Sequence, residues 1–240
     1  MVNRINVQFD DPFEHLVCDD LLLNQCDQNP GVGSIRFWET DLNCVVLGYG
    51  NDLESEVFSE RCRSEKVSVV RRCSGGGAVV LGHGCLNYSL ILPIKCHERL
   101  ASVNGANELI MDRNRSALQG VSGDVISVRG YTDLVSGDIK FSGNAQRRRR
   151  QALLFHGTFL LDFDVSLMER LLRFPSRQPD YRKGRSHSVF VGNLSATRSD
   201  VVAAMMKEWC VETEIGGIDR DIVLEAVSTR RKSLRWQLIR

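Results

Sequence analysis

Two arginines run into three consecutive glycines in the segment Val70–Ser89, which reads VRRCSGGGAVVLGHGCLNYS. A run of three glycines is entropically costly in a helix or strand, and it is tolerated where a backbone must approach something closely. Beside the guanidinium groups of Arg71 and Arg72, a phosphate or a carboxylate is the partner that fits. A flexible hairpin tip with solvated arginines is the competing interpretation, and this segment alone favours neither.

A single lysine stands among strand-forming residues in the segment Asp138–Gln146, DIKFSGNAQ. In an extended chain, Lys140 points to the face opposite that of Ile139 and Phe141, so it is expected to be alone on its face, beside a glycine. This placement suits a cation aimed at an anionic ligand. An exposed strand lysine is the commoner case for any one lysine, and it remains the alternative.

Four segments in this order resemble the lipoate–protein ligase family, within the wider group of biotin/lipoate ligases and octanoyltransferases. They are RRCSGGGAV, LNYSL, DIKFSGNAQ and HGTFLLD. A later segment, Pro179–Leu194 (PDYRKGRSHSVFVGNL), is also similar to lipoate ligase-like chains. The resemblance covers most of the chain, from Ile35 to Leu194.

The resemblance implies a two-step ATP-dependent acyl transfer. The carboxylate of lipoate or octanoate attacks the α-phosphate of ATP, with Mg²⁺, giving an acyl-adenylate and pyrophosphate. The ε-amine of a lysine on a lipoyl acceptor domain then displaces AMP. The acceptor would belong to a 2-oxoacid dehydrogenase or be the glycine cleavage H protein. Because negative charge builds on oxygen in both steps, fixed cations and backbone N–H donors should supply most of the catalysis.

Site residues follow from the resemblance, position by position. Lys140 would be the catalytic residue, binding the acyl carbonyl and phosphate oxygens without becoming a covalent nucleophile. Asp133, in YTDLVSGD, matches an acidic position near the phosphate and the metal, which makes it the candidate Mg²⁺ contact. The other expected substrate and ATP contacts are Arg72, Ser74, Gly75, Gly76, Gly77, Ala78, Val79, Val80, Asn87, Ser142, Gly143, His156, Gly157 and Thr158.

Several of these residues also have a purely structural interpretation. Asn87 could satisfy buried backbone groups, and His156 is expected to be a hydrogen-bonded strand histidine rather than a proton shuttle. The apolar residues around Gly77 and in Leu153–Phe155 could form an acyl tunnel or plain core. The run Arg147–Arg150 is typical of a solvated edge, but lipoyl acceptor domains tend to be acidic, so a docking role stays open.

Related transferases provide the main rival function, acyl transfer from a preformed donor through a cysteine thiol. No cysteine lies between Cys96 and Cys210, where those enzymes carry theirs. Cys73 remains as a thiol, with a pKa that the arginines should lower, but we interpret it as a packing residue. A biotin ligase fits less well, because its usual glycine-rich signature is G-R-G-R. The remaining alternative is a non-catalytic acyl-adenylate binding protein.

Composition favours a cytoplasmic enzyme. Lys and Arg number 31 against 30 Asp and Glu, so no nucleic-acid role is implied. The N-terminal sequence lacks the apolar region of a secretory signal, and no apolar run reaches membrane-spanning length. The eight cysteines show no zinc-site spacing and are expected to be reduced and mostly buried.

Element patterns predict an α/β (α+β) fold with a mixed, largely antiparallel sheet flanked by helices, and the resemblance implies the fold of biotin/lipoate ligases and class II tRNA synthetase catalytic domains. The spacing predicts helices over Pro12–Cys26, with Asp11 as the cap, and over Glu54–Lys66 and Glu98–Leu118. Residues 1–195 are expected to form the catalytic domain and residues 196–240 a small helical extension. Larger relatives carry an accessory domain, so activation could need a separate accessory subunit.

Overall fold

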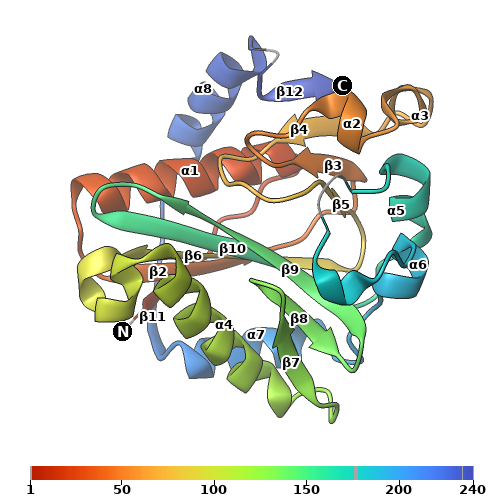
Figure 1. The fold of residues 1–240 in the computed structure, drawn as a ribbon. Coiled ribbons are helices and arrows are strands. Elements are labelled where there is room, and N and C mark those ends of the chain that lie inside the picture. The colour runs from red at the N-terminus through yellow and green to blue at the C-terminus, as the bar shows by residue number, and fades with distance from the viewer. Residues whose placement is uncertain (1, 176–177, 234, 240) are drawn as a thin grey trace.

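The structure, a computed structural model, describes residues 2–175, 178–233 and 235–239. Its strands form two sheets against which the helices pack (Figure 1). The larger sheet has eight strands in the order β11-β1-β2-β6-β10-β9-β8-β7, and the smaller has four in the order β12-β4-β3-β5. The predicted mixed sheet with flanking helices is therefore confirmed.

The larger sheet is antiparallel from β2 to β7, while β1 runs parallel to both of its neighbours. Its central strand β6 is buried at every position, as expected for a strand covered on both faces. Its strands are β1 (Val2–Ile5), β2 (Gly33–Trp38), β6 (Cys85–Pro93), β7 (Ile126–Arg129), β8 (Asp133–Ser136), β9 (Ile139–Arg148), β10 (Ala152–Leu160) and β11 (Val211–Ile215).

The smaller sheet carries the glycine-rich loop between β4 and β5. Strand β3 pairs with β4 in parallel and with β5 antiparallel, so the loop leaves one neighbour of β3 and returns as the other. Its strands are β3 (Cys44–Leu47), β4 (Ser68–Arg71), β5 (Val79–Leu81) and β12 (Gln237–Ile239).

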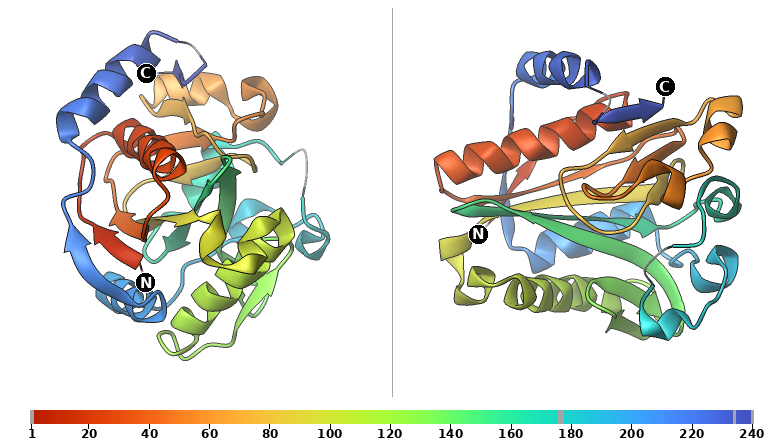
Figure 2. Two further views of the ribbon diagram at one scale, coloured as in Figure 1. Left: turned by 90° about the vertical axis from the view of Figure 1, so that its left-hand side faces the viewer. Right: turned by 45° about the horizontal axis from the view of Figure 1, so that its top comes forward.

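One helix lies between the sheets and two cover the opposite face of the larger sheet (Figures 1 and 2). Helix α1 packs on β6 and β10 and against α8, while α4 and α7 pack together below. The α-helices are α1 (Pro12–Gln28), α2 (Leu53–Glu56), α3 (Ser59–Ser64), α4 (Val103–Gln119), α5 (Ser166–Leu171), α6 (His187–Phe190), α7 (Arg198–Glu208) and α8 (Arg220–Arg231). Short 3₁₀ turns are η1 (Ile94–Cys96), η2 (Glu98–Ala101) and η3 (Asp180–Arg182).

The predicted cap of the first helix is confirmed, since the Asp11 carboxylate accepts a hydrogen bond of 2.8 Å from the Phe13 amide.

Two segments predicted as single helices are each divided into two shorter elements. The segment Glu54–Lys66 forms α2 and α3, because the Phe58 amide between them donates instead to the carbonyl of Leu171 at 2.9 Å. The segment Glu98–Leu118 begins as a 3₁₀ turn, and α4 starts anew with the Ser102 hydroxyl as its cap.

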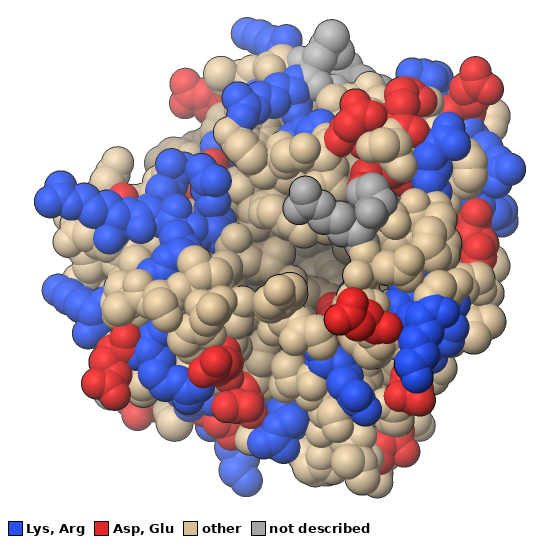
Figure 3. All heavy atoms as spheres, in the orientation of Figure 1, with Lys and Arg blue, Asp and Glu red and all other residues tan. Residues whose placement is uncertain are grey.

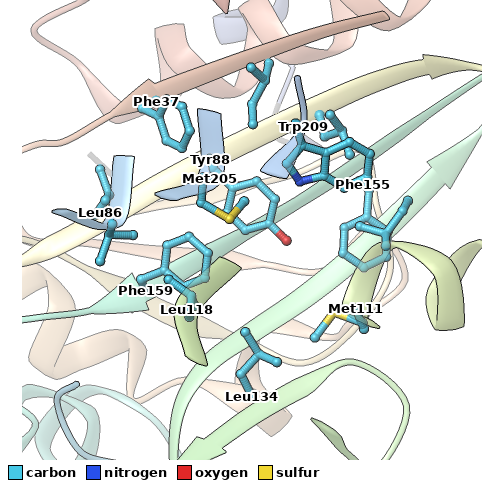
Figure 4. Close-up of a cluster of buried hydrophobic side chains, with 14 of the residues drawn as sticks. Phe37, Leu86, Tyr88, Met111, Leu118, Leu134, Phe155, Phe159, Met205 and Trp209 are labelled. Atoms are coloured by element: carbon cyan, nitrogen blue, oxygen red, sulfur yellow. The ribbon is translucent and has the colours of Figure 1, made fainter. Parts of the chain in front are cut away.

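The largest hydrophobic core fills the space between the sheet and the layer of α4 and α7. Tyr88 lies at its centre, with its ring stacked on Phe159 at 5.0 Å between centroids (Figure 4). The Tyr88 hydroxyl is bonded on two sides, donating to Asn144 Oδ1 and accepting from Asn114 Nδ2, each at 2.7 Å. This arrangement ties the helix layer to β9, the strand that carries Lys140.

The C-terminal residues pack back onto both sheets. Strand β11 pairs with β1 in the larger sheet, and β12 pairs with β4 in the smaller one. Helix α8 buries Val223 and Val227 in the core cluster that contains α1. The Arg71 amide at the end of β4 donates to the carbonyl of Trp236, so this C-terminal segment borders the start of the glycine-rich loop.

Candidate active site

A cavity of about 820 Å³ lies between the two sheets, and its mouth is the hollow near the centre of Figure 3. Strands β5, β6, β9 and β10 contribute to its wall, together with α1 and the segment that follows α5. The predicted residues that line it are Arg72, Gly76, Gly77, Ala78, Val79, Val80, Asn87, Asp133, Lys140, Ser142, Gly143, His156, Gly157 and Thr158. The structure therefore brings together four segments that are far apart in sequence.

Two of the predicted residues lie outside the cavity wall. Ser74 is fully buried, and its hydroxyl lies 2.5 Å from His156 Nε2. Gly75 is exposed, and its carbonyl accepts from Arg72 Nη2 at 2.7 Å. In this structure both residues support the loop rather than face the cavity.

Arg72 organises the glycine-rich loop from beneath. The residue is 7 % exposed, and its guanidinium donates to the carbonyls of Gly75 and Gly77, at 2.7 and 2.9 Å. Because carbonyl and N–H point in opposite directions across a trans peptide, the amides after these two carbonyls point away from Arg72. Burial lowers the Arg72 pKa to about 10, so the side chain stays charged at neutral pH.

Gly76 explains why the middle of this loop must be glycine. Its φ of +92° is unfavourable for residues with a side chain, and a Cβ there would lie 2.8 Å from Arg72 Nη2. The glycine thus lets the backbone curl tightly over the guanidinium. Arg71 has a separate role, since its Nη1 donates to the carbonyls of Gly48 and Asn51, each at 2.7 Å.

Lys140 is paired, contrary to the expectation that it stands alone on its face. Its Nζ lies 2.7 Å from Asp133 Oδ1, with the two side chains 26 % and 15 % exposed. The pair forms because a β-bulge sets Asp133 opposite Gly143, and the lysine lies across that glycine, where a Cβ would be 3.0 Å from Nζ. The other Asp133 oxygen accepts from the Tyr181 hydroxyl at 2.8 Å.

The remaining polar residues of the wall are held in pairs. Thr158 Oγ1 donates to Asn87 Oδ1 at 2.6 Å, and Asn87 is 3 % exposed. Thr132, beside Asp133, donates to the carbonyl of Asn144 at 2.7 Å, while the Asn144 amide donates back to the carbonyl of Thr132. This reciprocal pair fixes the segment that presents Asp133.

One end of the cavity is apolar, with walls from α1, β2, β3 and β5. Leu16, Trp38, Val46 and Leu81 line it, all from the core cluster between the sheets. Of the two interpretations of Leu153–Phe155, acyl tunnel or plain core, the structure supports core, because these residues are fully buried in the core clusters and do not line the cavity. The apolar residues after Gly77 do line it.

No cysteine lines the cavity among the described residues. The expectation that neighbouring arginines lower the Cys73 pKa is wrong, because burial, reinforced by Asp20, raises that pKa to about 12. Cys73 packs instead in the core cluster between the sheets, at 7 % exposure. A protonated, packed thiol is a poor nucleophile.

Within the described ranges there is no group of three or more His, Cys, Asp or Glu side chains placed to hold a metal. Asp133, the candidate magnesium contact, already bonds Lys140 and Tyr181 through its two oxygens. With both Asp133 oxygens engaged in this way, the described residues do not form a magnesium site in this arrangement. None of the described helices has the length and apolar content needed to span a bilayer.

Sequence reasoning missed two buried charges at the cavity: Asp19, which lines it, and Arg36, which does not. They form an ion pair of 2.8 Å at 1 % and 0 % side-chain exposure. A local signal existed for Asp19, since Asp19 and Asp20 interrupt the apolar face of α1. Arg36 gave none, because its partner lies 17 residues away.

Comparison with known proteins gives relatives of two activities. A putative lipoate-protein ligase A from Aeropyrum pernix is 31 % identical over 230 residues, covering 92 % of this chain and 83 % of that protein. An octanoyltransferase LipM from Macrococcus caseolyticus is 27 % identical over 238 residues, covering 90 % and 86 %.

Solved structures of lipoate ligases share the fold. The bi-partite lipoate protein ligase of Thermoplasma acidophilum, described with its E2 lipoyl domain, superposes with a TM-score of 0.79 at 17 % identity, covering 98 % of this chain and 94 % of that one. A putative lipoate protein ligase of T. acidophilum with bound lipoic acid gives 0.75 at 18 %, covering 96 % and 95 %. A lipoate-protein ligase A bound with ATP gives 0.77 at 19 %, covering 98 % and 97 %.

A family model confirms the relationship that the glycine-rich and lysine segments indicate. The model for the lipoyl protein ligase A/B catalytic domain matches residues 11–215, which include every residue of the cavity described above. This chain belongs to the lipoyl protein ligase A/B catalytic domain family.

Proposed function

We propose that this chain is an ATP-dependent lipoate–protein ligase that activates lipoate or octanoate and transfers the acyl group to a lysine of a lipoyl domain. The observation that carries the proposal is the placement of Lys140 in a cavity whose wall also contains the glycine-rich loop and an apolar end. The apolar end suits a saturated acyl chain. The lysine and the loop suit the phosphates of ATP.

In the first step, a carboxylate oxygen of the acyl acid attacks the α-phosphorus of ATP, and the bond from that phosphorus to pyrophosphate breaks. Lys140 lies on the cavity wall and can move its ammonium from Asp133 to a phosphoryl oxygen. The loop amides turned away from Arg72 donate to the same charge. These donors stabilise the oxygens on which negative charge grows.

In the second step, the acceptor amine attacks the acyl carbon, the bond from that carbon to AMP breaks, and the amine releases a proton to solvent or phosphate. Lys140 stays near the carbonyl and the departing AMP. His156 is not needed as the base, because its Nε2 is 2.5 Å from the buried Ser74 hydroxyl. This use of His156 agrees with the sequence-based interpretation of a hydrogen-bonded strand histidine.

Transfer from a preformed acyl donor is the second candidate function, because octanoyltransferases are among the relatives. It would need a nucleophile to carry the acyl group in the cavity. Cys73 is packed and protonated at neutral pH, and no cysteine occurs between Cys96 and Cys210. These facts favour the ATP-dependent reaction.

We further propose that residues 1–195 carry the catalytic site and that residues 196–240 form an extension, which adds β11 and β12 to the two sheets, with an accessory subunit as a separate partner. The bi-partite relative supports the idea of a partner.

The acceptor domain would bind at the basic side chains over the β9–β10 hairpin, which form a docking surface (Figure 3). Arg148 is excluded from docking because its guanidinium donates to the carbonyl of Leu100 at 2.7 Å, whereas Arg150 is exposed.

Intact-mass analysis of a lipoyl domain tests the activity. The domain is incubated with the protein, ATP, Mg²⁺ and either lipoate or octanoate, and a parallel reaction receives synthetic lipoyl-AMP. An ATP-dependent gain of one acyl group supports a self-sufficient ligase. Gain only from lipoyl-AMP supports the ligase with an absent accessory subunit, and gain from neither rejects it.

A Lys140→Ala variant tests the role of the lysine, with exposed Lys207→Ala as the matched control. Loss of the ammonium should lower the acylation rate about 10²-fold or more, on the scale of removing one preorganised donor. The unfolding free energy should change by only about 1 kcal/mol, because the ion pair is partly exposed. An active Lys140→Ala protein would remove the central assignment.

A further inference from the structure

A continuous chain of buried polar groups runs from α1 to the underside of the glycine-rich loop. Asp19 Oδ2 lies 3.6 Å from His156 Nδ1, and His156 Nε2 lies 2.5 Å from Ser74 Oγ. Ser74 Oγ lies 3.0 Å from Arg72 Nε. The four residues come from α1, β10 and the loop, and each is less than 10 % exposed.

The two ends of this chain, Arg72 and Asp19, set the direction in which its hydrogen bonds are donated. Arg72 can only donate and an ionised Asp19 can only accept. Ser74 Oγ therefore accepts from Arg72, and in the arrangement that gives every proton an acceptor it donates to His156 Nε2, which leaves the ring proton on Nδ1, facing Asp19. Each group then has one role, and the loop carbonyls held by Arg72 lie at the end of the chain.

Asp19 is kept ionised by its surroundings. Burial opposes its charge, but Arg36 and hydrogen bonds from His156 and Ser89 outweigh burial and hold the Asp19 pKa below its ordinary value. Arg36 Nη1 lies 2.8 Å from Asp19 Oδ1, and the Ser89 hydroxyl lies 2.5 Å from Oδ2. The acceptor at this end of the chain is therefore permanent at neutral pH.

We propose that Asp19 is a positioning residue which, through His156 and Ser74, holds Arg72 and hence the glycine-rich loop in the orientation that binds the acyl-phosphate oxygens. The inference rests on the proposed ligase function for its catalytic consequence, but the structural consequence for the loop is independent of it.

The same three side chains have the residue types of a nucleophilic triad, and the structure argues against that use. Ser74 is fully buried, does not line the cavity, and accepts a hydrogen bond from Arg72 that a nucleophilic serine would not need. His156, by contrast, lines the cavity.

Asp19→Asn is the informative substitution, because it preserves shape and removes the charge. An asparagine can present its amide to His156 Nδ1, which favours the proton on Nε2. Ser74 Oγ would then receive two donors, leaving its own proton without an acceptor. Asp20→Asn is the matched control, since Asp20 is also on α1 and buried, but contacts Arg149 and Arg230 instead.

Hydrogen–deuterium exchange of the loop peptides, residues 74–80, gives a readout that does not depend on activity. We expect exchange about tenfold faster in Asp19→Asn and in Ser74→Ala, and unchanged in Asp20→Asn, with global unfolding measured in parallel. Unchanged exchange in both Asp19→Asn and Ser74→Ala, or an equal rise in Asp20→Asn, overturns the proposal. If Asp19→Asn does not fold, Ser74→Ala carries the test.

A double-mutant cycle on the acylation rate completes the experiment. If the two residues act through one chain, the Asp19→Asn/Ser74→Ala protein is no slower than the slower single variant, with a loss of about 10²-fold. The proposal is overturned if the rate losses of the two single variants multiply in the double variant, or if peptide mass analysis finds an acyl group on Ser74. If the wild-type protein acylates nothing, the ligase function fails while the exchange result still decides the loop inference.

Discussion

Acidification should destabilise the protein through one buried histidine, His15. The ring is fully buried and stacks on Trp38 at 4.2 Å between centroids. Its Nδ1 lies 2.7 Å from Arg36 Nη2, a permanent donor, and its Nε2 lies 3.0 Å from the carbonyl of Phe9. A second ring proton would face the guanidinium, so burial first and Arg36 second lower the His15 pKa to about 3.

The sign and size of the effect follow from linkage. Below pH 6.5, the ordinary value for histidine, the unfolded chain binds a proton that the native state refuses down to a pH of about 3. The contribution of neutral His15 to the free energy of unfolding is therefore complete above pH 6.5. It falls as the pH drops, by about 1.4 kcal/mol per pH unit. Between pH 6.5 and 5 the loss from His15 alone is about 2 kcal/mol.

Urea unfolding followed by tryptophan fluorescence measures this loss. The comparison is between wild type and His15→Gln at pH 7.5 and pH 5. At pH 7.5 the variant has a lower free energy of unfolding than the wild type. Acidification lowers the unfolding free energy of the wild type through His15 but not that of the variant, so the difference between the two proteins should narrow by about 2 kcal/mol at pH 5. His83→Gln is the control. His83 is exposed and Asp41 raises its pKa, so the difference in unfolding free energy between wild type and this variant should not narrow at pH 5. A difference that stays constant between the two pH values refutes the reasoning.

Three further changes have defined outcomes. Gly157→Ala should lower the acylation rate and should lower the free energy of unfolding by about 2 kcal/mol, because its Cβ would lie 1.8 Å from Asn144 Oδ1. Acylation assays and thermal melting check these two effects. Tyr181→Phe removes the hydrogen bond to Asp133, and should raise the KM for ATP severalfold while leaving the KM for octanoate unchanged in steady-state assays. Arg150→Glu should raise the KM for an acidic acceptor domain and leave adenylate formation unchanged; slowed adenylation would reject docking at this residue.

The parts of the site that could be predicted from sequence are those with a local chemical reason. Three glycines after two arginines indicate a backbone held close to a charged group, and Gly76 indeed curls over Arg72. Lys140 was placed correctly on a strand beside a glycine, but its partner Asp133 was not foreseen. That pairing depends on a bulge between β8 and β9, which leaves no periodic signal in either strand.

The contacts that were missed join residues distant in sequence. His156 and Ser74 are 82 residues apart, so neither residue's neighbours indicate the other. The same holds for short edge strands. Strand β11 (VETEI) alternates β-branched residues with glutamates, but it is only five residues long and exposed at four of them, so nothing local indicates that it pairs with β1.

Arg72 and Lys140, two of the cations that line the cavity, differ in what holds them, and this difference separates their roles. Arg72 is buried and donates to carbonyl and hydroxyl oxygens, with no carboxylate in ion-pair contact among the described residues. Neutral acceptors orient a guanidinium without cancelling its charge, so its field extends through the loop toward the cavity. Lys140 has a flexible side chain and one carboxylate partner, Asp133, which a phosphate can replace. The arginine therefore shapes the anion site and the lysine can follow the charge as the reaction moves it from phosphate to acyl oxygen.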